Sequence, residues 1–323
     1  MRSGRTAPSK TALVTGGAGF IGSHVAEAYL ARGWAVTVVD NLSSGKRENI
    51  PDGAEFVELD VRSDELHDLF DRKGGFELIN HHAAQIDVRL SVERPRFDAD
   101  VNVLGTLNLL EAAREWRSRR VVFISSGGVV YGDADSRPIP ENAPKKPESP
   151  YGVGKLVGEY YLRCYRLLYG LDYVALRYSN VYGPRQDPHG EAGVVAIFCN
   201  RLLAAEPLTV FGSGEQTRDY TYVGDVVEAN MIVSDAELDE GSNLDDRAFN
   251  VGTGEETSVN ELAAALMDAV GRKVAIERAP ARPGELERNS LAGDRLRALG
   301  WEAAVDLSDG LRRTYRWIAE NSV

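Results

Sequence analysis

Tyr151 and Lys155 stand four positions apart at the start of a predicted helical stretch, directly after Pro150. Residues with this spacing lie on the same face of a helix. A lysine ammonium beside a tyrosine stabilises the phenolate and lowers the tyrosine pKa from about 10 toward neutral pH. Such a phenolate can act as a general base toward an alcohol. An exposed Tyr–Lys pair without function is the simpler interpretation, so the pair needs support from the rest of the chain.

A glycine-rich turn, residues 15–22 (TGGAGFIG), lies between an apolar stretch and an amphipathic segment at 21–32. A strand, a glycine turn and a helix in this order form the phosphate-binding turn of dinucleotide-binding domains, where the helix N-terminus faces the pyrophosphate. Gly16 and Gly19 are expected to let the backbone approach the phosphates. Gly22 is expected to let the helix pack closely on the strand.

Asp40 ends the second predicted strand, at residues 35–40. A carboxylate at this place accepts hydrogen bonds from ribose hydroxyls and repels a 2′-phosphate, which favours NAD over NADP. Lys46 and Arg47 follow in a loop and could attract such a phosphate, but solvated side chains are the simpler interpretation. The sequence therefore favours NAD.

Ser125 and Ser126 end another predicted strand, at the carboxyl edge where doubly wound sheets bind ligands. Serines at such places also cap turns and helices, so the two carry little weight alone. Their occurrence together with the glycine turn, Asp40 and the Tyr–Lys pair argues against coincidence. One site for NAD and for proton transfer to and from a hydroxyl is expected.

Predicted strands alternate with helices through the first half of the chain, at 12–15, 35–40, 55–60, 77–80, 121–125 and 174–177. This alternation predicts an α/β fold with a Rossmann-type doubly wound parallel sheet. Later loops are rich in Gly and Pro, with helices predicted at 194–204, 259–270 and 307–319. We expect an NAD-binding domain at 1–180 and a smaller mixed α/β substrate-binding domain at 181–323, with some later segments returning to the first domain.

Composition excludes several classes of protein. The net charge of −12 argues against nucleic acid or an anionic membrane as a partner. No run of 18 apolar residues and no signal peptide is apparent, so no membrane span is expected. Cys164 and Cys199 stand alone, which favours the cytoplasm. His81 and His82 would face opposite sides of a strand, and the five histidines are scattered, so no metal site is expected.

Blocks along nearly the whole chain resemble, in order, those of the extended short-chain dehydrogenase/reductase family. In the first half they are residues 15–22, 40–41, 60–61, 82–85, 102, 125–132 and 149–155. Those at 177–186, 218–220, 249–252 and 282–285 are similar to UDP-glucose 4-epimerases. The resemblance implies NAD as cofactor, a UDP-hexose substrate, and a homodimer formed through helices near 97–116 and 151–168.

The resemblance also implies individual roles. Tyr151, Lys155 and a serine would be catalytic. NAD would be bound by Gly16, Gly19, Phe20, Ile21, Gly22, Asp40, Asn41, Ser43, Gly45, Asp60, Val61, Ala83, Ala84, Gln85, Asn102, Ser125, Tyr151, Lys155 and Tyr178. The UDP-sugar would be bound by Asn180, Arg185, Val210, Phe211, Arg218, Tyr220, Arg282, Glu285 and Asn289. Many relatives carry Ser or Thr where this chain has Gly127, so Ser126 is assigned the sugar-hydroxyl contact and Ser125 is the reserve.

The implied reaction is the interconversion of UDP-glucose and UDP-galactose, by oxidation at C4, rotation of the 4-keto sugar and reduction on its other face. The related dehydratases carry an acidic pair where this chain has Gly128 and Val129, which disfavours elimination. Asp187 would repel the carboxylate of a uronate sugar. The 4-epimerisation of UDP-N-acetylglucosamine or UDP-glucuronate remains an alternative, as does a non-catalytic NAD-binding regulator.

Overall fold

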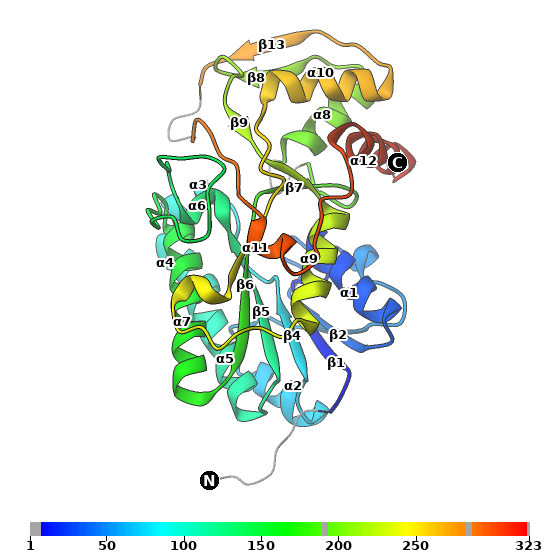
Figure 1. Ribbon diagram of the computed structural model, residues 1–323. Coiled ribbons are helices and arrows are strands. Elements are labelled where there is room, and N and C mark those ends of the chain that lie inside the picture. Colours follow the sequence, from blue (N-terminus) through cyan, green and yellow to red (C-terminus); the bar gives the residue numbers. More distant parts are fainter. Residues whose placement is uncertain (1–7, 189–192, 282–285, 322–323) are drawn as a thin grey trace.

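The computed structural model describes residues 8–188, 193–281 and 286–321. At its centre lies a seven-stranded parallel sheet with the order β11-β6-β5-β4-β1-β2-β3 (Figure 1). The strands are β1 (Thr11–Thr15), β2 (Ala35–Asp40), β3 (Glu55–Glu58), β4 (Leu78–His81), β5 (Arg120–Ser126), β6 (Asp172–Tyr178) and β11 (Ala248–Val251). The strand order reverses between β1 and β4, where doubly wound sheets bind ligands. The predicted α/β class with a Rossmann-type sheet is confirmed.

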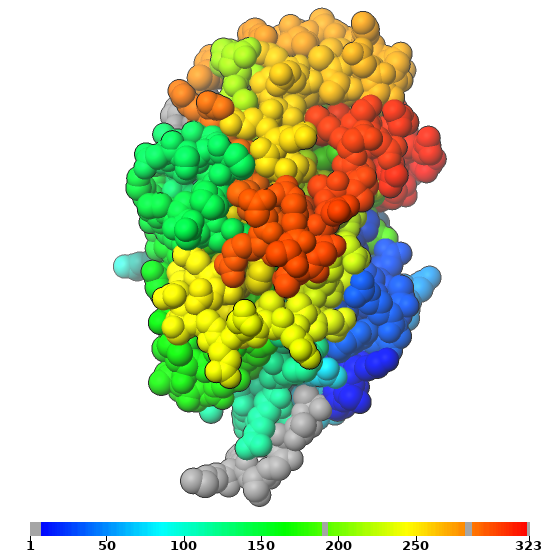
Figure 2. Space-filling view, viewed as in Figure 1, coloured from blue at the N-terminus to red at the C-terminus, as the bar shows by residue number. Residues whose placement is uncertain are grey.

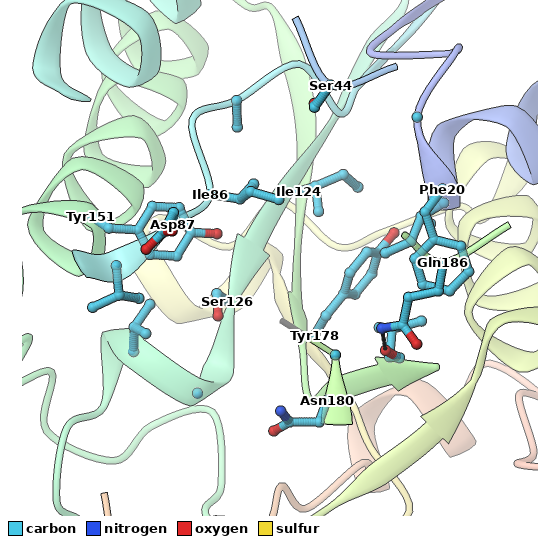
Figure 3. A pocket seen from close by; sticks show the side chains of 18 of the residues that line it. Phe20, Ser44, Ile86, Asp87, Ile124, Ser126, Tyr151, Tyr178, Asn180 and Gln186 are labelled. Carbon is cyan, nitrogen blue, oxygen red and sulfur yellow. Dashed lines mark hydrogen bonds between the residues drawn. The ribbon is translucent and has the colours of Figure 1, made fainter. Parts of the chain in front are cut away.

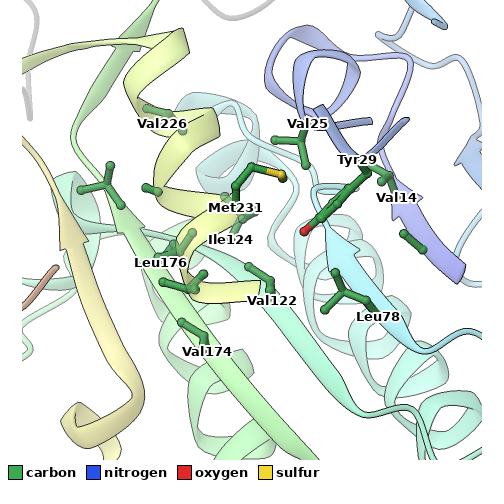
Figure 4. Close-up of a cluster of buried hydrophobic side chains, with 14 of the residues drawn as sticks. Val14, Val25, Tyr29, Leu78, Val122, Ile124, Val174, Leu176, Val226 and Met231 are labelled. Atoms are coloured by element: carbon green, nitrogen blue, oxygen red, sulfur yellow. The ribbon is translucent and has the colours of Figure 1, made fainter. Parts of the chain in front are cut away.

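Helices cover both faces of the sheet. One layer holds α1 (Phe20–Ala31) and α9 (Val223–Asp235); the other holds α2 (Glu65–Lys73), α5 (Gly105–Glu115) and α7 (Pro150–Tyr169). Alternate residues of a strand point to opposite faces. Val14 of β1 therefore packs in the core with α1 and α9, whereas Leu13 packs in the core with α2 and α5. Figure 4 shows the first core, where Tyr29 of α1 and Met231 of α9 meet over the strands.

Local signals explain where the important helix α7 begins and ends. The Ser149 side chain caps the helix by accepting a hydrogen bond from the Gly152 amide at 3.1 Å. Pro150 occupies the first turn, where its missing N–H costs nothing. Gly170 ends the helix in the left-handed conformation, with φ of 73°. These three positions place Tyr151 in the first turn, next to the carboxyl edge of the sheet.

The second half contributes a smaller part, at the top of Figure 1. Its strands pair as β7 (Asn180–Tyr182) with β10 (Tyr220–Tyr222), β8 (Leu208–Phe211) with β13 (Ile276–Ala279), and β9 (Thr217–Arg218) with β12 (Thr257–Ser258). The helices α8 (Val194–Leu203), α10 (Val259–Val270) and α12 (Leu307–Asn321) enclose a separate core that includes Phe198, Leu262 and Leu311. The three helices predicted in this half lie where the sequence placed them, whereas its short strands were not predicted.

Some later segments lie against the first part. β11 pairs with β6, and α9 packs on α1. Figure 2 shows the orange segment that carries α11 (Asp294–Arg297) on the surface between the upper and lower parts. The division into domains at residue 180 remains a prediction. The remaining helices are short: α3 (Val88–Glu93), α4 (Pro95–Ala99), a π-helical turn (Asp100–Leu104) and α6 (Gly127–Val130). None of the helices in the described ranges has the length and apolar character needed to cross a bilayer.

Candidate active site

A cavity of about 1220 Å³ lies at the carboxyl edge of the seven-stranded sheet, between the sheet and the smaller part of the molecule. The sheet side supplies strand ends and the turns that follow them, among them Gly16, Asp40 and Ser126. The smaller part supplies Phe211 and Arg218. Ligand sites commonly measure roughly 300–1,000 Å³, so this cavity has room for more than one small molecule.

The glycine turn at one end of the cavity excludes side chains by contact. A Cβ atom on Gly16 would lie 2.6 Å from the Ala83 amide nitrogen, and one on Gly22 would lie 2.3 Å from the Gly16 carbonyl oxygen. Gly16 also has a φ of 68°, which disfavours other residues. Gly19, directly before α1, and Phe20, Ile21 and Gly22 in its first turn also border the cavity. The turn thus forms a cradle of bare backbone that fits a pyrophosphate at a helix N-terminus.

Asp40 borders the same end of the cavity and is 7% exposed. Its carboxylate accepts hydrogen bonds from the amides of Ala18 at 3.0 Å and Leu42 at 2.8 Å. Burial raises the pKa of this carboxyl, and the two amide hydrogen bonds oppose the increase. A Cβ atom on Gly45 would approach the carboxylate to 2.9 Å, so Gly45 allows the loop to close over Asp40. A fixed carboxylate here fits the ribose hydroxyls of NAD.

The adenine end predicted from the resemblance contains a second acidic group. Asp60 accepts hydrogen bonds from Arg62 and from the Asn41 amide at 2.8 Å. The Arg62 guanidinium holds the pKa of the Asp60 carboxyl well below its usual range. The predicted residues Asn41, Ser43, Asp60, Val61, Ala83 and Ala84 all border the cavity.

Tyr151 and Lys155 border the middle of the cavity, on the face of α7 that packs on the sheet. The Lys155 Nζ atom donates to the Ile124 carbonyl at 2.9 Å and lies 5.7 Å from the centroid of the Tyr151 ring. Burial lowers the pKa of Lys155 from 10.5 to about 8, and the charge of Asp98 opposes this shift. His82 nearby stays neutral, because burial and the Lys155 charge lower its pKa to about 3.

The two serines at the end of β5 differ in their surroundings. The Ser125 hydroxyl donates to the Glu159 carboxylate at 2.6 Å, and both residues are at most 2% exposed. Both serines border the cavity, and Figure 3 shows Ser126, the next residue along the strand, between Tyr151 and Tyr178. Because the Ser125 proton is engaged with Glu159, Ser126 is the better placed of the two to meet a substrate hydroxyl.

On the opposite side, the predicted residues Asn180, Phe211, Arg218, Tyr220 and Asn289 border the cavity. Asn289 is 1% exposed, yet neither its amide nitrogen nor its amide oxygen has a hydrogen-bond partner within the described residues. A buried amide without partners is costly unless a ligand satisfies it. Arg282 and Glu285 lie outside the described residues.

Two residues predicted to bind the sugar nucleotide do not border the cavity. Arg185 instead points to α1, where it forms an ion pair with Glu27 at 3.0 Å and donates to the Ser23 hydroxyl at 3.3 Å. Val210 is fully buried in the core of the smaller part, because alternate residues of β8 face inward; its neighbour Phe211 borders the cavity instead. Neither residue borders the cavity in this structure, and direct contact of the two with a substrate stays a prediction.

Gln85 and Asn102 were predicted to contact NAD, and neither borders the cavity. Their side chains both donate to the buried carboxylate of Asp98, at 2.9 and 3.0 Å. The Asn102 oxygen also accepts from the Gln85 amide at 2.9 Å. The two residues therefore brace the loop after β4 from behind. The sequence pattern does not reveal these partners, and contact of Gln85 and Asn102 with NAD stays a prediction.

Several residues at the cavity were missed. The loop after β4 places Ile86 and Asp87 at the cavity that Tyr151 also borders (Figure 3), and Asp87 also caps α3 by accepting from the Arg89 amide at 2.8 Å. Gln186 lies across the cavity, near Phe20 in Figure 3, and its amide oxygen has no partner among the described residues. A polar residue in the loop after a parallel strand was the signal available for Asp87. No group of three or more His, Cys, Asp or Glu in the described part of the chain is arranged for a metal ion.

Several known proteins are similar to this chain in sequence and fold. Residues 12–252 match the model of the NAD dependent epimerase/dehydratase family. The chain is 47% identical to a UDP-glucose 4-epimerase of Mycolicibacterium smegmatis, over 96% of this chain and 99% of the relative. It is also similar to the crystal structure of a UDP-glucose 4-epimerase from Thermotoga maritima with UDP-glucose, with a TM-score of 0.91 and 42% identity over 96% and 99% of the two chains. A Thermus thermophilus UDP-glucose 4-epimerase in complex with NAD gives a TM-score of 0.89 and 45% identity over 97% and 100%.

Proposed function

The chain belongs to the NAD-dependent epimerase/dehydratase family, and from this premise we propose that it interconverts UDP-glucose and UDP-galactose. The observation that carries the proposal is the meeting of a Tyr–Lys pair, a glycine cradle with Asp40, and sugar-nucleotide side chains in one cavity of about 1220 Å³. That volume accommodates NAD and a UDP-sugar together. NAD is the cofactor of this family, and the proposed epimerisation returns it to its starting state in each cycle.

In the proposed mechanism, Tyr151 removes the proton from the C4 hydroxyl, and Lys155 stabilises the phenolate that does so. Ser126 holds the hydroxyl in line with Tyr151. NAD, when bound, accepts the hydride from C4 and later returns it to the other face of the sugar. Asn180 and Arg218 hold the diphosphate while the keto sugar turns, since a guanidinium is a strong partner for phosphate oxygens.

The side chains present do not support elimination. Gly128 and Val129 occupy the places where the related dehydratases carry acids. The carboxylate of Asp87 borders the cavity, but it already accepts the amides of Arg89 and Leu90 as a helix cap. Epimerisation expels no water, so it needs no acid at these places.

A second activity is favoured by Asn289. Its amide is buried at the cavity with no partner in the described ranges, and an acetamido group offers one donor and one acceptor to satisfy it. We propose that UDP-N-acetylglucosamine and its C4 epimer are secondary substrates. Solved structures similar to this chain include a UDP-N-acetylglucosamine 4-epimerase from Methanobrevibacter ruminantium, at 31% identity and a TM-score of 0.89.

We propose the homodimer through the helices near 97–116 and 151–168, and the exposed side chains support it. The largest exposed apolar side chains gather mainly on α7 and the neighbouring helices: Val88, Val92, Leu104, Val153, Tyr160, Tyr161, Leu167, Leu168 and Tyr169. Contiguous apolar surface of this kind marks protein interfaces. Light scattering after size-exclusion chromatography measures the mass, and Leu168→Glu should shift it toward a monomer.

Cys164 and Cys199 are both free thiols, consistent with a cytoplasmic location.

The proposal is tested by incubating the purified protein with UDP-galactose and following the sugar signals by NMR. Conversion to UDP-glucose, and the reverse reaction from UDP-glucose, is the expected result. UDP-N-acetylglucosamine and UDP-glucuronate complete the substrate panel. No conversion of UDP-galactose, by protein that is shown to carry NAD, would overturn the proposed function.

A further inference from the structure

A chain of buried polar side chains runs through the apolar core behind the cavity and ends at Tyr178. Its other members are Tyr29, Asn80, Asn230 and Ser234, which are 0–1% exposed. They lie among Val14, Val25, Leu78, Val122, Val226 and Met231, and Figure 4 shows Tyr29 reaching from α1 into this cluster. Of the five, only Tyr178 borders the cavity. The chain therefore joins the reacting edge of the sheet to the core behind it.

Asn230 of α9 is the central member. Its Nδ2 atom donates to the Tyr178 hydroxyl at 2.6 Å and to the Val226 carbonyl at 2.8 Å. Its Oδ1 atom accepts from the Asn80 amide at 3.0 Å. A carbonyl oxygen can only accept, so Val226 fixes which end of the Asn230 amide is the donor. The Tyr178 hydroxyl is therefore the acceptor in its contact with Asn230.

The far end of the chain has an equally definite direction. Asn80 also donates to the Tyr29 hydroxyl at 3.0 Å. The Ser234 hydroxyl donates its one proton to the main-chain carbonyl of Asn230 at 2.7 Å. Tyr29 is therefore the donor in its 2.6 Å contact with the Ser234 hydroxyl. These hydrogen bonds thus connect α1, β4 and α9 to Tyr178, the last residue of β6. Donor and acceptor are fixed in each of these hydrogen bonds, so the Tyr178 side chain has little freedom to rotate.

Burying amides and hydroxyls in an apolar core is a poor way to gain stability, because well-packed apolar side chains serve as well. Orientation is the property that such a chain supplies. Tyr178 pairs in register with Ser126, and Figure 3 shows its ring between Ser126 on one side and Phe20 of the glycine turn on the other. Tyr178 borders the same cavity as the glycine turn and Tyr151. We therefore expect a cofactor whose phosphates lie at that turn, and whose reactive ring reaches a sugar at Tyr151, to lie against Tyr178.

We propose that Asn230 is a positioning residue for the reaction: it fixes the Tyr178 ring through its hydroxyl, and that ring holds the reactive ring of NAD in a single orientation. The proposal rests on the proposed function for its role in turnover. A cofactor ring that is free to turn returns the hydride less often, and the keto sugar and the reduced cofactor then accumulate.

The test uses Asn230→Leu, which keeps the size of the side chain, and Tyr178→Phe, which keeps the ring. Each should lower kcat about ten- to hundredfold, the effect of a misplacement of about 1 Å. The UDP-sugar KM should change less than about twofold, because the sugar nucleotide contacts are intact. During turnover, absorbance at 340 nm should show a larger reduced fraction of bound cofactor. The double variant should be no worse than either single variant, since both remove the same contact.

Ser234→Ala is the matched control. This variant removes hydrogen bonds of the same buried network, but at the end away from Tyr178. It should therefore lower thermal stability and leave kcat and the 340 nm signal at the wild-type level. Wild-type kcat in Tyr178→Phe, additive losses in the double variant, or an equal loss of kcat in Ser234→Ala would overturn the proposal. Tyr178→Phe decides the question by itself if Asn230→Leu fails to fold.

A measurement without sugar separates this inference from the proposed function. Borohydride reduces the bound cofactor, and the fluorescence anisotropy of the reduced ring reports how rigidly the ring is held. Anisotropy should fall in Asn230→Leu and Tyr178→Phe but not in Ser234→Ala. That pattern in a protein unable to epimerise UDP-sugars would reject the proposed function and keep the positioning role. Equal anisotropy in all four proteins would reject the positioning role.

Discussion

The Nζ atom of Lys155 lies 5.7 Å from the centre of the Tyr151 ring, one helical turn further along α7. The same atom donates to the Ile124 carbonyl of β5 at 2.9 Å. Lys155 is 5% exposed, so its ammonium group is positioned beside the phenol by its hydrogen bond to β5 and is hardly solvated. Ser126 ends the same strand two residues beyond Ile124, which sets base, ammonium and hydroxyl on one rigid frame.

Tyr151→Phe should lower turnover by at least about a hundredfold, the lower end of what a general base contributes. The ring and its packing remain, so UDP-sugar affinity should change little. Steady-state kinetics with UDP-galactose and isothermal titration with UDP measure the two quantities. A variant with near wild-type turnover would remove Tyr151 from the mechanism.

Lys155 should make stability depend on pH in the alkaline range. Its pKa is about 8 in the folded protein and 10.5 without burial. Between these values the unfolded chain binds a proton that the folded chain does not, so Lys155 makes the free energy of unfolding rise as pH increases. Lys155→Met lacks this contribution. Urea denaturation at several pH values should show wild-type stability gaining on the variant across this window, and a constant difference would contradict the assignment.

The two serines should separate by mutation. Ser126→Ala removes a hydroxyl that borders the cavity, and we expect turnover to fall about tenfold or more, with thermal stability nearly unchanged. Ser125→Ala leaves the buried Glu159 carboxylate with one hydrogen bond fewer, so it should lower the melting temperature and reduce turnover less. Melting curves and kinetics of the pair make the comparison. The reverse order of turnover would transfer the sugar contact to Ser125.

Asp40→Ala should relax the preference for NAD over NADP. The wild-type carboxylate borders the cavity near the glycine turn, where it would repel the 2′-phosphate of NADP. Binding of each cofactor to protein stripped of its own cofactor measures the ratio of affinities, with Asp60→Ala as a control at the neighbouring carboxylate. Unchanged discrimination in Asp40→Ala would mean that another residue selects the cofactor.

Asn289→Tyr should reduce activity on N-acetylated UDP-sugars far more than activity on UDP-glucose. The larger side chain would fill the space beside the sugar that Asn289 leaves open, and pocket-size discrimination of this kind amounts to roughly 10- to 200-fold. The ratio of kcat/KM for UDP-N-acetylglucosamine and UDP-glucose is the measurement. Equal loss on both substrates, or no loss on either, would show that Asn289 does not border the C2 substituent.

Local patterns in the sequence were enough to predict the parallel sheet, the glycine turn and the Tyr–Lys face of α7. Each of these depends on short-range physics: alternation of apolar strands with helices, close backbone contact at Gly16 and Gly22, and four-residue spacing on a helix. For the same reason Asp40 and Ser126, at the carboxyl ends of strands, were predicted to lie at the site, and both border the cavity.

Only the tertiary structure decided which polar side chains face the ligand and which support it from behind. Gln85 and Arg185 have residue types that suit a binding site, but their hydrogen-bond partners Asp98 and Glu27 come from other elements. Ser125 borders the cavity, but its hydroxyl donates to Glu159 of another element. Asn230 carried no local signal at all, since its contact with Tyr178 joins residues 52 positions apart. Such contacts depend on how helices pack across a sheet, and the spacing of residues along the chain does not predict them.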